Sequence, residues 1–458
     1  MTSAREHVSW GVRVAYAAPA FAMAVVGIPI YVYLPKLYTD VVGVEMATVG
    51  ALLLGARVLD AVSDPFVGVL SDRTRSALGR RRPWIVGGAL PLAVAIVCLF
   101  HPPETGQGGA AWLGFWVFSV FAFWACVTVP YESLGPEITF DYDARTSLLA
   151  VRDGALILGT LAAAISPLVV EALLDLPATP AGERSKLFWV AAAWGPLVVA
   201  ACLWCAYVVR EPSAAPPASA PRTRVGIGDA LAAVRSNRPF AILLASYTVS
   251  ALGSNLPATL ILYYVEYVLE APWAEGFLVL YFVTGVAFLP AWVWLARRIG
   301  KKAAWLASMS VNSGAFLGVF FLGPGDAVGY GVLVALSGTG FGATLAIASS
   351  MQADVIDYDE LLSGRRREGL YVGIWSVARK LSAALGVGLA LPLIGAAGYV
   401  PNAVQGPDVQ LMLRVLYALV PSLCNAAAIA IALAYPISRE RHREILLSLG
   451  RAAEVRAA

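Results

Sequence analysis

Long apolar runs, each about as long as a membrane-crossing helix, alternate with short polar segments along the whole chain. A helix needs about 20 predominantly apolar residues to cross a bilayer. The pattern predicts twelve such helices, six in each half of the chain. The predicted spans cover residues 12–38, 46–70, 84–101, 111–136, 148–174, 187–209, 239–267, 273–296, 303–323, 328–356, 369–397 and 410–436.

The character of the sequence changes between the sixth and seventh spans. Residues 211–237 are rich in proline, alanine, serine and charged residues, which is typical of a cytoplasmic linker. We therefore expect an all-α membrane protein with two pseudosymmetric six-helix bundles, residues 1–210 and 238–458, the second ending in a cytoplasmic tail. Bundles of this kind enclose one cavity near the bilayer midplane, which opens alternately to each side.

Basic residues near the ends of the spans predict the orientation, because Lys and Arg in short loops stay on the cytoplasmic side. With the N-terminus inside, every dense basic cluster is cytoplasmic, and the exceptions are Lys36 and the mixed segment with Glu183, Arg184 and Lys186. We expect a multi-pass protein of the plasma (inner) membrane with both termini cytoplasmic. Outside the linker, the cytoplasmic basic residues are Arg73, Arg75, Arg80, Arg81, Arg82, Arg145, Arg297, Arg298, Lys301, Lys302, Arg365, Arg366 and Arg367.

Composition excludes several classes of protein. The chain is 59% apolar and only 14% charged, whereas soluble domains are about 25% charged. Its net charge of +3 is explained by basic cytoplasmic loops, so we expect no nucleic-acid partner. All five cysteines lie in apolar runs, which predicts neither disulfides nor a cysteine metal site. The common hydrolase, zinc-protease and phosphate-loop motifs are missing, so we expect no enzyme and no cofactor.

Three charged residues lie inside the second predicted span. Arg57, Asp60 and Asp64 are spaced i, i+3 and i+7, which places them on one face of a helix. A charged side chain at the bilayer centre costs roughly 2.5–3.5 kcal/mol, so this face is expected to point into the protein. Two carboxylates one turn apart favour a bound cation or a shared proton. The alternative is an interior ion pair between Arg57 and Asp60 that holds two helices together.

A charged motif, GVLSDRTRSALGRRRPW, follows this span at residues 68–84, and a degenerate copy, WLARRIGKKAAW, lies at the equivalent place in the second half. The pair resembles the loop signature of the major facilitator superfamily. Further motifs are LYTDVVGV, VPYESLGPEIT, and WSVARKLSAALG followed by GYVPN. With these the chain is similar to the glycoside, pentoside and hexuronide to cation symporters, the group that includes the bacterial melibiose permeases.

This resemblance implies that Asp60 and Asp64 bind a coupling cation, Na⁺ or H⁺. The third cation-binding carboxylate of the melibiose permeases corresponds to Thr128 in this chain. A threonine hydroxyl still offers an oxygen to Na⁺, and the alternative is that Thr128 bonds only to its own helix backbone. Two carboxylates and a hydroxyl favour Na⁺ over H⁺. Apart from a Na⁺ site, we expect no metal.

The resemblance is weaker for the solute. The family's sugar-binding carboxylate corresponds to Ala24 and its stacking aromatic to Glu132, and both departures count against a galactoside. Arg152 and Lys380 stand where the family places basic residues that line the cavity, so they join Glu132 as solute-binding candidates. The alternative is charge pairing, of Arg152 with Glu132 and of Lys380 with the two carboxylates of the second span.

Other residues are candidates for the transport pathway or its gates. Tyr131 and Trp375 have aromatic faces suited to a sugar ring, although such residues in spans commonly serve for packing. Asp354 and Asp357 lie near the Arg365–Arg367 cluster, which is typical either of a gating ion pair or of a solvated loop. The expected gating or charge-pairing residues are Arg57, Asp72, Arg73, Asp354 and Asp357.

The function expected from these residues and the resemblance is secondary active symport, in which Na⁺ or H⁺ drives the movement of a small polar solute such as a glycoside. An alternative is a cation-coupled carrier of an amphipathic or anionic solute, such as a lysolipid or a uronide. A different alternative is a membrane receptor or scaffold that does not transport. The expected partners are the solute, the cation and the bilayer, and we expect a monomer.

Overall fold

The computed structural model describes residues 8–103, 108–139, 142–211, 227–364 and 367–450. All regular secondary structure in these residues is helical. Contacts divide the chain into two compact units, unit 1 with Met1–Pro221 and Leu391–Gln405, and unit 2 with Arg222–Ala390 and Gly406–Ala458. Residues 212–226 of the predicted linker lie outside the described residues.

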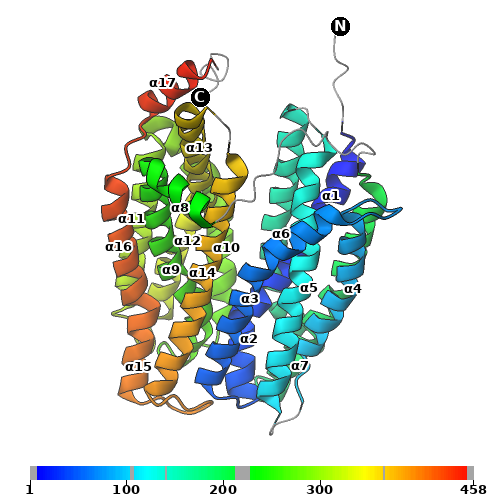
Figure 1. Ribbon diagram of the computed structural model, residues 1–458. Coiled ribbons are helices and arrows are strands. Elements are labelled where there is room, and N and C mark those ends of the chain that lie inside the picture. The colour runs from blue at the N-terminus through cyan, green and yellow to red at the C-terminus, as the bar shows by residue number, and fades with distance from the viewer. Residues whose placement is uncertain (1–7, 104–107, 140–141, 212–226, 365–366, 451–458) are drawn as a thin grey trace. The chain divides into compact units, whose positions relative to one another are not determined.

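Unit 1 is a bundle of long helices with a short irregular connection after the first (Figure 1). Pro29 and the π-helical turns η1 and η2 interrupt the first apolar run, whose path continues as far as Val41. The elements are α1 (Trp10–Ile28), η1 (Pro29–Tyr33), α2 (Leu34–Lys36), η2 (Leu37–Val41), α3 (Met46–Arg73), α4 (Arg82–Leu99), α5 (Gly109–Ile138), α6 (Tyr142–Leu174) and α7 (Pro180–Val208).

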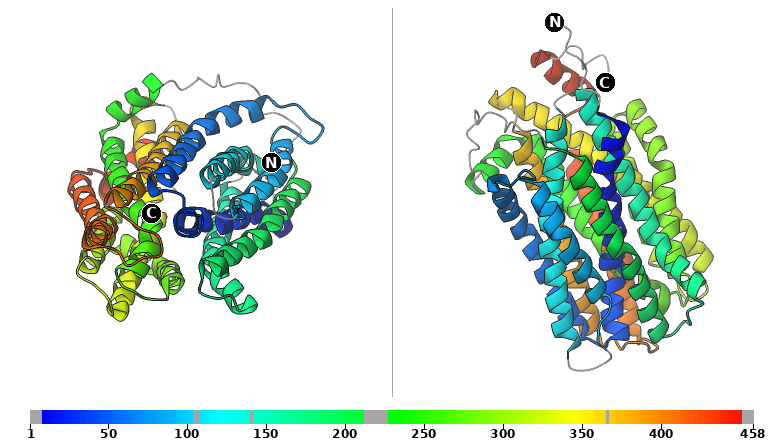
Figure 2. Two further views of the ribbon diagram at one scale, coloured as in Figure 1. Left: turned by 90° about the horizontal axis from the view of Figure 1, so that it is seen from below. Right: turned by 90° about the vertical axis from the view of Figure 1, so that its right-hand side faces the viewer.

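Unit 2 is a second helical bundle, and Figure 2 shows how the helices within each unit run alongside one another. A short helix, α8, precedes the bundle and another, α17, follows it. The elements are α8 (Ile227–Ser236), α9 (Arg238–Tyr267), α10 (Ala274–Ile299), α11 (Lys301–Val319), α12 (Ala327–Ala343), η3 (Thr344–Ala348), α13 (Ser349–Ser363), α14 (Glu368–Ala396), α15 (Pro407–Arg414), η4 (Val415–Leu419), α16 (Val420–Leu433) and α17 (Arg439–Ser448).

Eleven helical stretches in the described part of the chain are long and apolar enough to cross a membrane. The ninth predicted span forms α11, which has 19 residues but is less apolar than the others. Its polar side chains find partners inside unit 2: Ser313 Oγ donates to Ser422 O at 3.0 Å, and Asn312 Oδ1 accepts from Ser337 Oγ at 2.6 Å. Such bonds satisfy polar groups that lipid could not satisfy.

Small residues allow the helices of unit 1 to approach closely. α1 packs along α6, and a Cβ added to Gly159 of α6 would lie 2.3 Å from Phe21 O on α1. Gly135 of α5 makes room for Tyr16, whose hydroxyl would lie 2.1 Å from an added Cβ. Small residues at such contacts are characteristic of helix packing in membranes, where close van der Waals contact replaces the hydrophobic effect.

An aromatic cluster occupies one end of unit 2. Tyr264 of α9 stacks on Tyr417 with ring centres 4.4 Å apart, and the hydroxyls of Tyr330 and Tyr417 are 2.6 Å apart. Tyr264 Oη also donates to Val319 O at 2.7 Å. The buried hydroxyls therefore satisfy one another or the backbone, which is required in a place closed to water.

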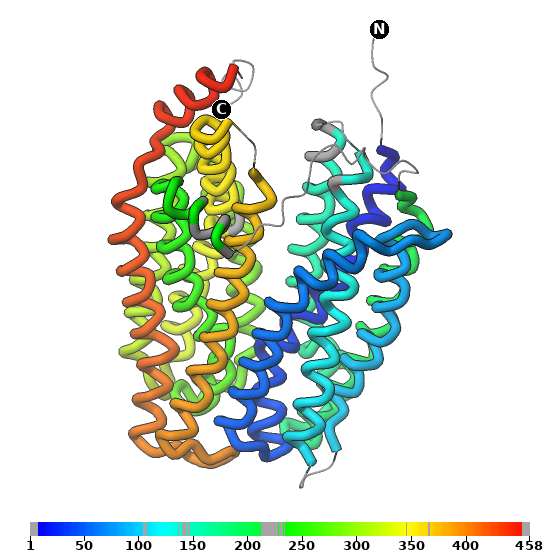
Figure 3. The backbone as a smooth tube through the Cα atoms, in the orientation of Figure 1, coloured from blue at the N-terminus to red at the C-terminus, as the bar shows by residue number. Residues whose placement is uncertain are grey.

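The end of α14 and the segment after it belong to unit 1, and Figure 3 traces this continuous path from α14. Tyr399 Oη donates to Asp40 Oδ1 at 2.7 Å, and Asn402 Nδ2 donates to Asp40 O at 2.7 Å. Thr39 Oγ1 also donates to Asp40 Oδ1 at 2.7 Å. Gln405 closes the segment on itself by donating to Val400 O at 2.6 Å. These contacts hold the LYTDVVGV and GYVPN motifs together.

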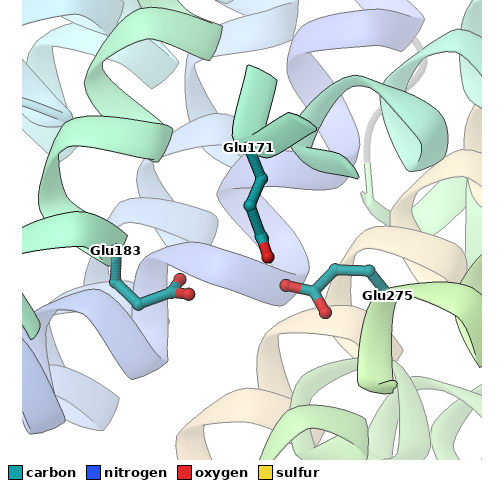
Figure 4. A group of neighbouring side chains, drawn as sticks. All are labelled: Glu171, Glu183 and Glu275. Carbon is teal, nitrogen blue, oxygen red and sulfur yellow. The ribbon is translucent and has the colours of Figure 1, made fainter. Parts of the chain in front are cut away.

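The charged residues that did not fit the predicted charge bias are paired within unit 1. Lys186 of α7 is 2% exposed, and its Nζ lies 2.6 Å from Glu183 and 3.1 Å from Glu171. Figure 4 shows Glu171 of α6 and Glu183 of α7 pointing toward one another; Glu275, also labelled there, belongs to unit 2. Arg184 donates to Pro102 O and Pro103 O at 3.1 Å each.

The close approach of α1 and α6 predicts that Gly159→Ala destabilises the protein. Overpacking of a tight contact costs typically 1–3 kcal/mol, whereas alanine is a better helix former than glycine by about 1 kcal/mol. We expect a lower apparent melting temperature in detergent for Gly159→Ala. Gly154→Ala on the same helix is the control, since an added Cβ there meets nothing within 4 Å. Equal stability of the two variants would contradict the packing argument.

Candidate functional site

The buried part of α3 carries Arg57 and Asp60. Asp60 is 4% exposed and Arg57 is 9% exposed. Arg57 Nη1 donates to Tyr31 Oη at 2.5 Å, and the guanidinium carbon lies 3.7 Å from the centre of the Tyr31 ring and 4.8 Å from that of Phe121. The carboxylate of Asp60 also acts electrostatically on this guanidinium, so the suggested ion pair with Asp60 stays a prediction. Two ring faces and a hydroxyl stabilise the guanidinium as well.

Asp64 follows one turn later on α3 and is half-buried. Pro65 comes directly after it inside the helix. Because proline has no N–H and its ring displaces the carbonyl four residues earlier, the carbonyl of Ala61 loses its usual helical donor. This carbonyl lies on the same stretch of helix as the two carboxylates. The region is therefore rich in oxygen atoms, the ligands that hard cations prefer.

Thr128 lies on α5, which packs directly against α3. Its Oγ1 donates to Trp124 O of the same helix at 2.9 Å, as the plainer alternative for this residue predicted. A hydroxyl that donates one hydrogen bond keeps its lone pairs as acceptors. The role of Thr128 in cation binding stays a prediction.

Tyr131 on α5 is a packing residue in this structure. It is 4% exposed, its Oη donates to Tyr16 O at 2.6 Å, and its ring centre lies 4.9 Å from that of Tyr16. These contacts join α5 to α1, so the side chain has little surface left for a solute.

Arg152 and Glu132 do not form the suggested pair. Arg152 of α6 donates instead to the neighbouring carboxylate, Asp153 Oδ1, at 2.7 and 2.9 Å. Glu132 and Asp153 are exposed although their helices are long enough to cross a membrane. Exposed carboxylates at such positions are expected to face water rather than lipid. Arg152, Asp153 and Glu132 are therefore polar, accessible side chains of α5 and α6 in unit 1.

In unit 2, the solute-binding candidates Trp375 and Lys380 lie on α14. The Trp375 ring is buried and stacks on Tyr247 of α9, with centres 4.1 Å apart and an angle of 29° between the planes. Lys380 is half-buried. It belongs to unit 2, whereas Asp60 and Asp64 belong to unit 1, so the suggested pairing between them stays a prediction. Arg379, directly before Lys380, is exposed; its charge inside an apolar span was a signal that sequence reasoning missed.

The loop after α3 is held by a network of charges. Arg81 is 3% exposed, and its Nη2 lies 2.8 Å from Glu137 Oε1 and 3.0 Å from Asp72 Oδ1, while Arg80 also contacts Glu137 at 2.8 Å. Burial raises the pKa of Glu137, but the hydrogen bonds and charges of Arg81 and Arg80 outweigh it and hold this pKa below its usual value. Asp72 is thus a charge-pairing residue, whereas Arg73 is exposed.

Glu211, the first residue of the predicted linker, caps the start of α4. Its carboxylate accepts hydrogen bonds from the backbone N–H groups of Arg80, Arg81 and Arg82 at 2.8, 2.8 and 2.9 Å. Gly79 precedes them with a φ of 99°, and a Cβ there would lie 2.6 Å from the Glu211 carboxyl carbon. A carboxylate at a helix N-terminus is electrostatically favourable. Sequence reasoning missed this role, because the partners are backbone groups.

Asp354 and Asp357 on α13 do not pair with the described part of the Arg365–Arg367 cluster. Asp354 Oδ1 lies 2.6 Å from Lys301 Nζ and 3.4 Å from His442 Nε2, and His442 lies 3.3 Å from Asp357 Oδ2. Ile445 and Leu446 of α17 are buried, and Figure 1 shows α17 close to the end of α13. The two aspartates therefore join α13 to α11 and α17.

Arg367 pairs with a different aspartate, Asp359. Its Nε and Nη2 donate to the two carboxylate oxygens at 2.9 and 2.5 Å, and Tyr371 Oη donates to the same carboxylate at 2.7 Å. The hydrogen bonds that Arg367 donates to Asp359 raise the pKa of Arg367 against the opposing effect of burial. Asp359 lies closer along the chain to the end of α13 than the predicted partners do. Arg365 and Arg366 lie outside the described residues.

Comparison with known proteins decides the family. A family model described as MFS/sugar transport protein matches residues 15–439. The chain belongs to this family. Its two helical bundles with eleven candidate spans and the more polar α11 agree with the twelve-helix fold of the superfamily, as predicted.

Proteins that resemble this MFS transporter bear the names of transporters of different solutes. The chain is 28% identical over 454 residues to the glucuronide carrier protein homolog of Escherichia coli, covering 97% of this chain and 96% of that protein. It is 27% identical to the isoprimeverose transporter of Lactiplantibacillus pentosus, covering 90% and 86%. A crystal structure of the nucleoside transporter NupG matches with a TM-score of 0.67 and 13% identity, covering 93% of this chain and 100% of that one.

The family settles the class of function. The protein is a secondary transporter of small polar solutes and not an enzyme. The predicted resemblance to cation symporters of glycosides is confirmed at the level of the family. The roles of individual residues in binding the solute and the cation follow from their positions and are argued below.

The charge network around Glu137 predicts a pH-dependent contribution to stability. Because its pKa is lowered in the folded state, the ionised carboxylate stabilises the fold above its unfolded pKa, about 4.3, and this stabilisation is lost as the pH falls through the folded pKa. Glu137→Gln should lower the stability at pH 7 by about 2 kcal/mol, measured by thermal unfolding in detergent.

The difference between Glu137→Gln and the wild type should begin to shrink as the pH falls below about 4.3 and should vanish only below the lower pKa of the folded state. Glu444→Gln is the matched control, because its ion pair with Arg441 is exposed on both sides and such pairs contribute little. A difference that already disappeared well above about pH 4.3, or one that did not shrink at all below it, would contradict the role given to the charge of Glu137.

Proposed function

We propose that this transporter couples the movement of its solute to a cation bound by Asp60 and Asp64. The observation that supports this most strongly is the burial of Asp60, 4% exposed in the middle of a membrane-spanning helix. A buried carboxylate is expensive unless it binds a positive partner. Asp64, the freed carbonyl of Ala61 and Thr128 of the adjacent helix supply further oxygens for a Na⁺ ion.

A membrane potential can drive such a step. One elementary charge that crosses 100 mV carries about 2.3 kcal/mol, which corresponds to accumulation of roughly 50-fold for a neutral solute. Supporting the inward direction of this drive, the arginine-rich loop before α4 and the Arg297–Lys302 segment carry the charge bias of cytoplasmic loops. We propose a plasma-membrane location with both termini inside the cell.

The proposed solute is a sugar or a sugar derivative. One relative is named an isoprimeverose transporter and another a homolog of a glucuronide carrier, and the family is described as sugar transport. A receptor or scaffold that does not transport would not need a buried carboxylate on α3 or exposed charges on α5 and α6. Cation-stimulated uptake of a solute in membrane vesicles separates transport from a scaffold role.

Replacement of the carboxylates tests the cation site. Asp60→Asn and Asp64→Asn should each abolish concentrative uptake while the protein still inserts and folds, because the amide cannot replace the charge. Uptake into vesicles with and without Na⁺ and pH gradients measures this, and circular dichroism checks the fold. Glu183→Gln, at a carboxylate in the first turn of α7 of the same unit, is the control. Normal accumulation by either aspartate variant would show that the cation site is wrong.

Thr128 tests which cation is used. Na⁺ needs several oxygen ligands, whereas a proton needs one carboxylate. If Na⁺ drives transport, Thr128→Ala should raise the Na⁺ concentration for half-maximal uptake severalfold, and Thr128→Ser, which keeps the oxygen, should change it little. An unchanged Na⁺ dependence in Thr128→Ala would favour H⁺ as the coupling ion and leave the hydroxyl with only its backbone hydrogen bond.

A further inference from the structure

A cleft lies between α4 and α7 of unit 1, at the end of these helices where the arginine-rich loop is found. Its volume is about 480 Å³. The residues that line it are mostly apolar or aromatic and include Leu78, Arg82, Val86, Leu203, Trp204 and Tyr207. None of them belongs to the proposed cation site, so the cleft is a separate feature of the unit.

α4 and α7 run in opposite directions along their contact. At one end Arg184, in the first turn of α7, donates to Pro102 O, just after the end of α4. Midway, a Cβ added to Gly195 of α7 would lie 3.1 Å from Val97 Cγ2 of α4. At the other end the first residue of α4, Arg82, donates through Nε to the carbonyl of Ala206, in the last turn of α7. The cleft is therefore formed by the start of α4 and the last turns of α7.

The surface around the cleft suits lipid. α4 carries no charged residue after Arg82, and α7 carries none after Lys186. On α4 the lining residue Val86 is followed at intervals of four residues by Leu90 and Val94, both exposed. An exposed apolar surface of this kind on membrane-spanning helices contacts acyl chains, since a water-filled interior would be lined by polar groups.

Two aromatic side chains place the cleft at the depth of the lipid headgroups. Tyr207 is 82% exposed and Trp204 is 46% exposed, and their spacing of three residues puts them side by side on α7. Trp and Tyr are enriched where the membrane meets water, because one part of each ring is apolar and another is polar. The cleft thus reaches from the headgroups to the acyl chains.

The guanidinium of Arg82 is the charged group of this cleft. The two arginines before it pair with Glu137. Arg82 instead donates to two backbone carbonyls, those of Ala206 and, at 3.4 Å, of Leu78, and the guanidinium has more N–H donors than these bonds use. Glu211 accepts its hydrogen bonds from backbone N–H groups, that of Arg82 included. Within the described ranges no carboxylate forms an ion pair with Arg82.

We propose that this cleft binds an anionic phospholipid of the surrounding membrane. The lipid phosphate accepts hydrogen bonds from the Arg82 guanidinium, whose planar fork matches two phosphate oxygens, and an acyl chain lies along Val86 and Leu203. Arg75 and Arg210, both exposed at the same end of unit 1, add positive charge, and basic pockets between spanning helices bind anionic headgroups. Because the same guanidinium holds the last turn of α7, the bound lipid should stabilise the unit.

Thermal unfolding of the purified, delipidated protein in detergent tests this proposal. Dioleoyl phosphatidylglycerol should raise the apparent melting temperature at a lower concentration than dioleoyl phosphatidylcholine, which has the same chains but no net charge. Glycerol phosphate, which has no acyl chains, should have no effect. Arg82→Gln should raise the phosphatidylglycerol concentration for half-maximal stabilisation by about 10-fold, close to the value for phosphatidylcholine.

Val86→Trp fills the cleft without changing any charge, so it should weaken the response to phosphatidylglycerol as well, and it decides the test if Arg82→Gln does not fold. Arg298→Gln is the matched control, because it removes an exposed arginine beside Trp294 at the end of α10, outside the cleft, and should respond like the wild type. The proposal is overturned if the two lipids stabilise equally, if glycerol phosphate stabilises as well as the lipid, or if Val86→Trp keeps the wild-type response.

Discussion

The free energy of placing a charge in a membrane governs how this chain is built. Each charged residue within a span needs a partner, an aromatic surface or water, because lipid offers none of these. Lys186 finds two glutamates, Arg57 finds Tyr31 and Phe121, and Arg152 finds Asp153. Charged side chains that have such partners stabilise a bundle, whereas charged side chains without them are accessible to a ligand.

Charges outside the membrane serve a different purpose. The network of Arg81, Glu137 and Asp72 fixes the loop between α3 and α4, and Glu211 ties the end of the sixth span to the same loop. In unit 2, His442 joins α17 to the aspartates of α13. Arg80, Arg81 and Arg367, which the charge bias assigns to orientation, are therefore also structural, since each pairs with a specific carboxylate. The basic residues of the loops determine on which side of the membrane these loops lie, and the acidic residues that pair with them determine the conformation of the loops.

The sequence predicted the elements of the fold well, because a run of about 20 apolar residues has no other stable use than a spanning helix. The twelve predicted spans all correspond to helices, including α11, whose serines and asparagine made it the least apolar. The two halves were also visible from the polar linker. The assignment of residues 391–405 to unit 1 was not, since it depends on hydrogen bonds to Asp40 from residues far away in the chain.

The site was predicted less completely, because spacing along one helix does not reveal partners on another. Asp60 is buried, as the free-energy cost of exposing a charge to lipid predicted. Arg57 contacts aromatic rings of other helices, and the spacing of residues along α3 could not predict these contacts. Arg367 forms its ion pair with Asp359 and not with Asp354 or Asp357, which lie nearer the centre of α13. Arg379 was overlooked although the same cost argument applies to it.

A solute that carries its own charge changes the energetics of symport. A monovalent anion that moves with one monovalent cation transfers no net charge, so the membrane potential does no work on the loaded step. Accumulation then depends on the cation gradient, at about 1.4 kcal/mol for each factor of ten, whereas a neutral solute also gains about 2.3 kcal/mol per 100 mV.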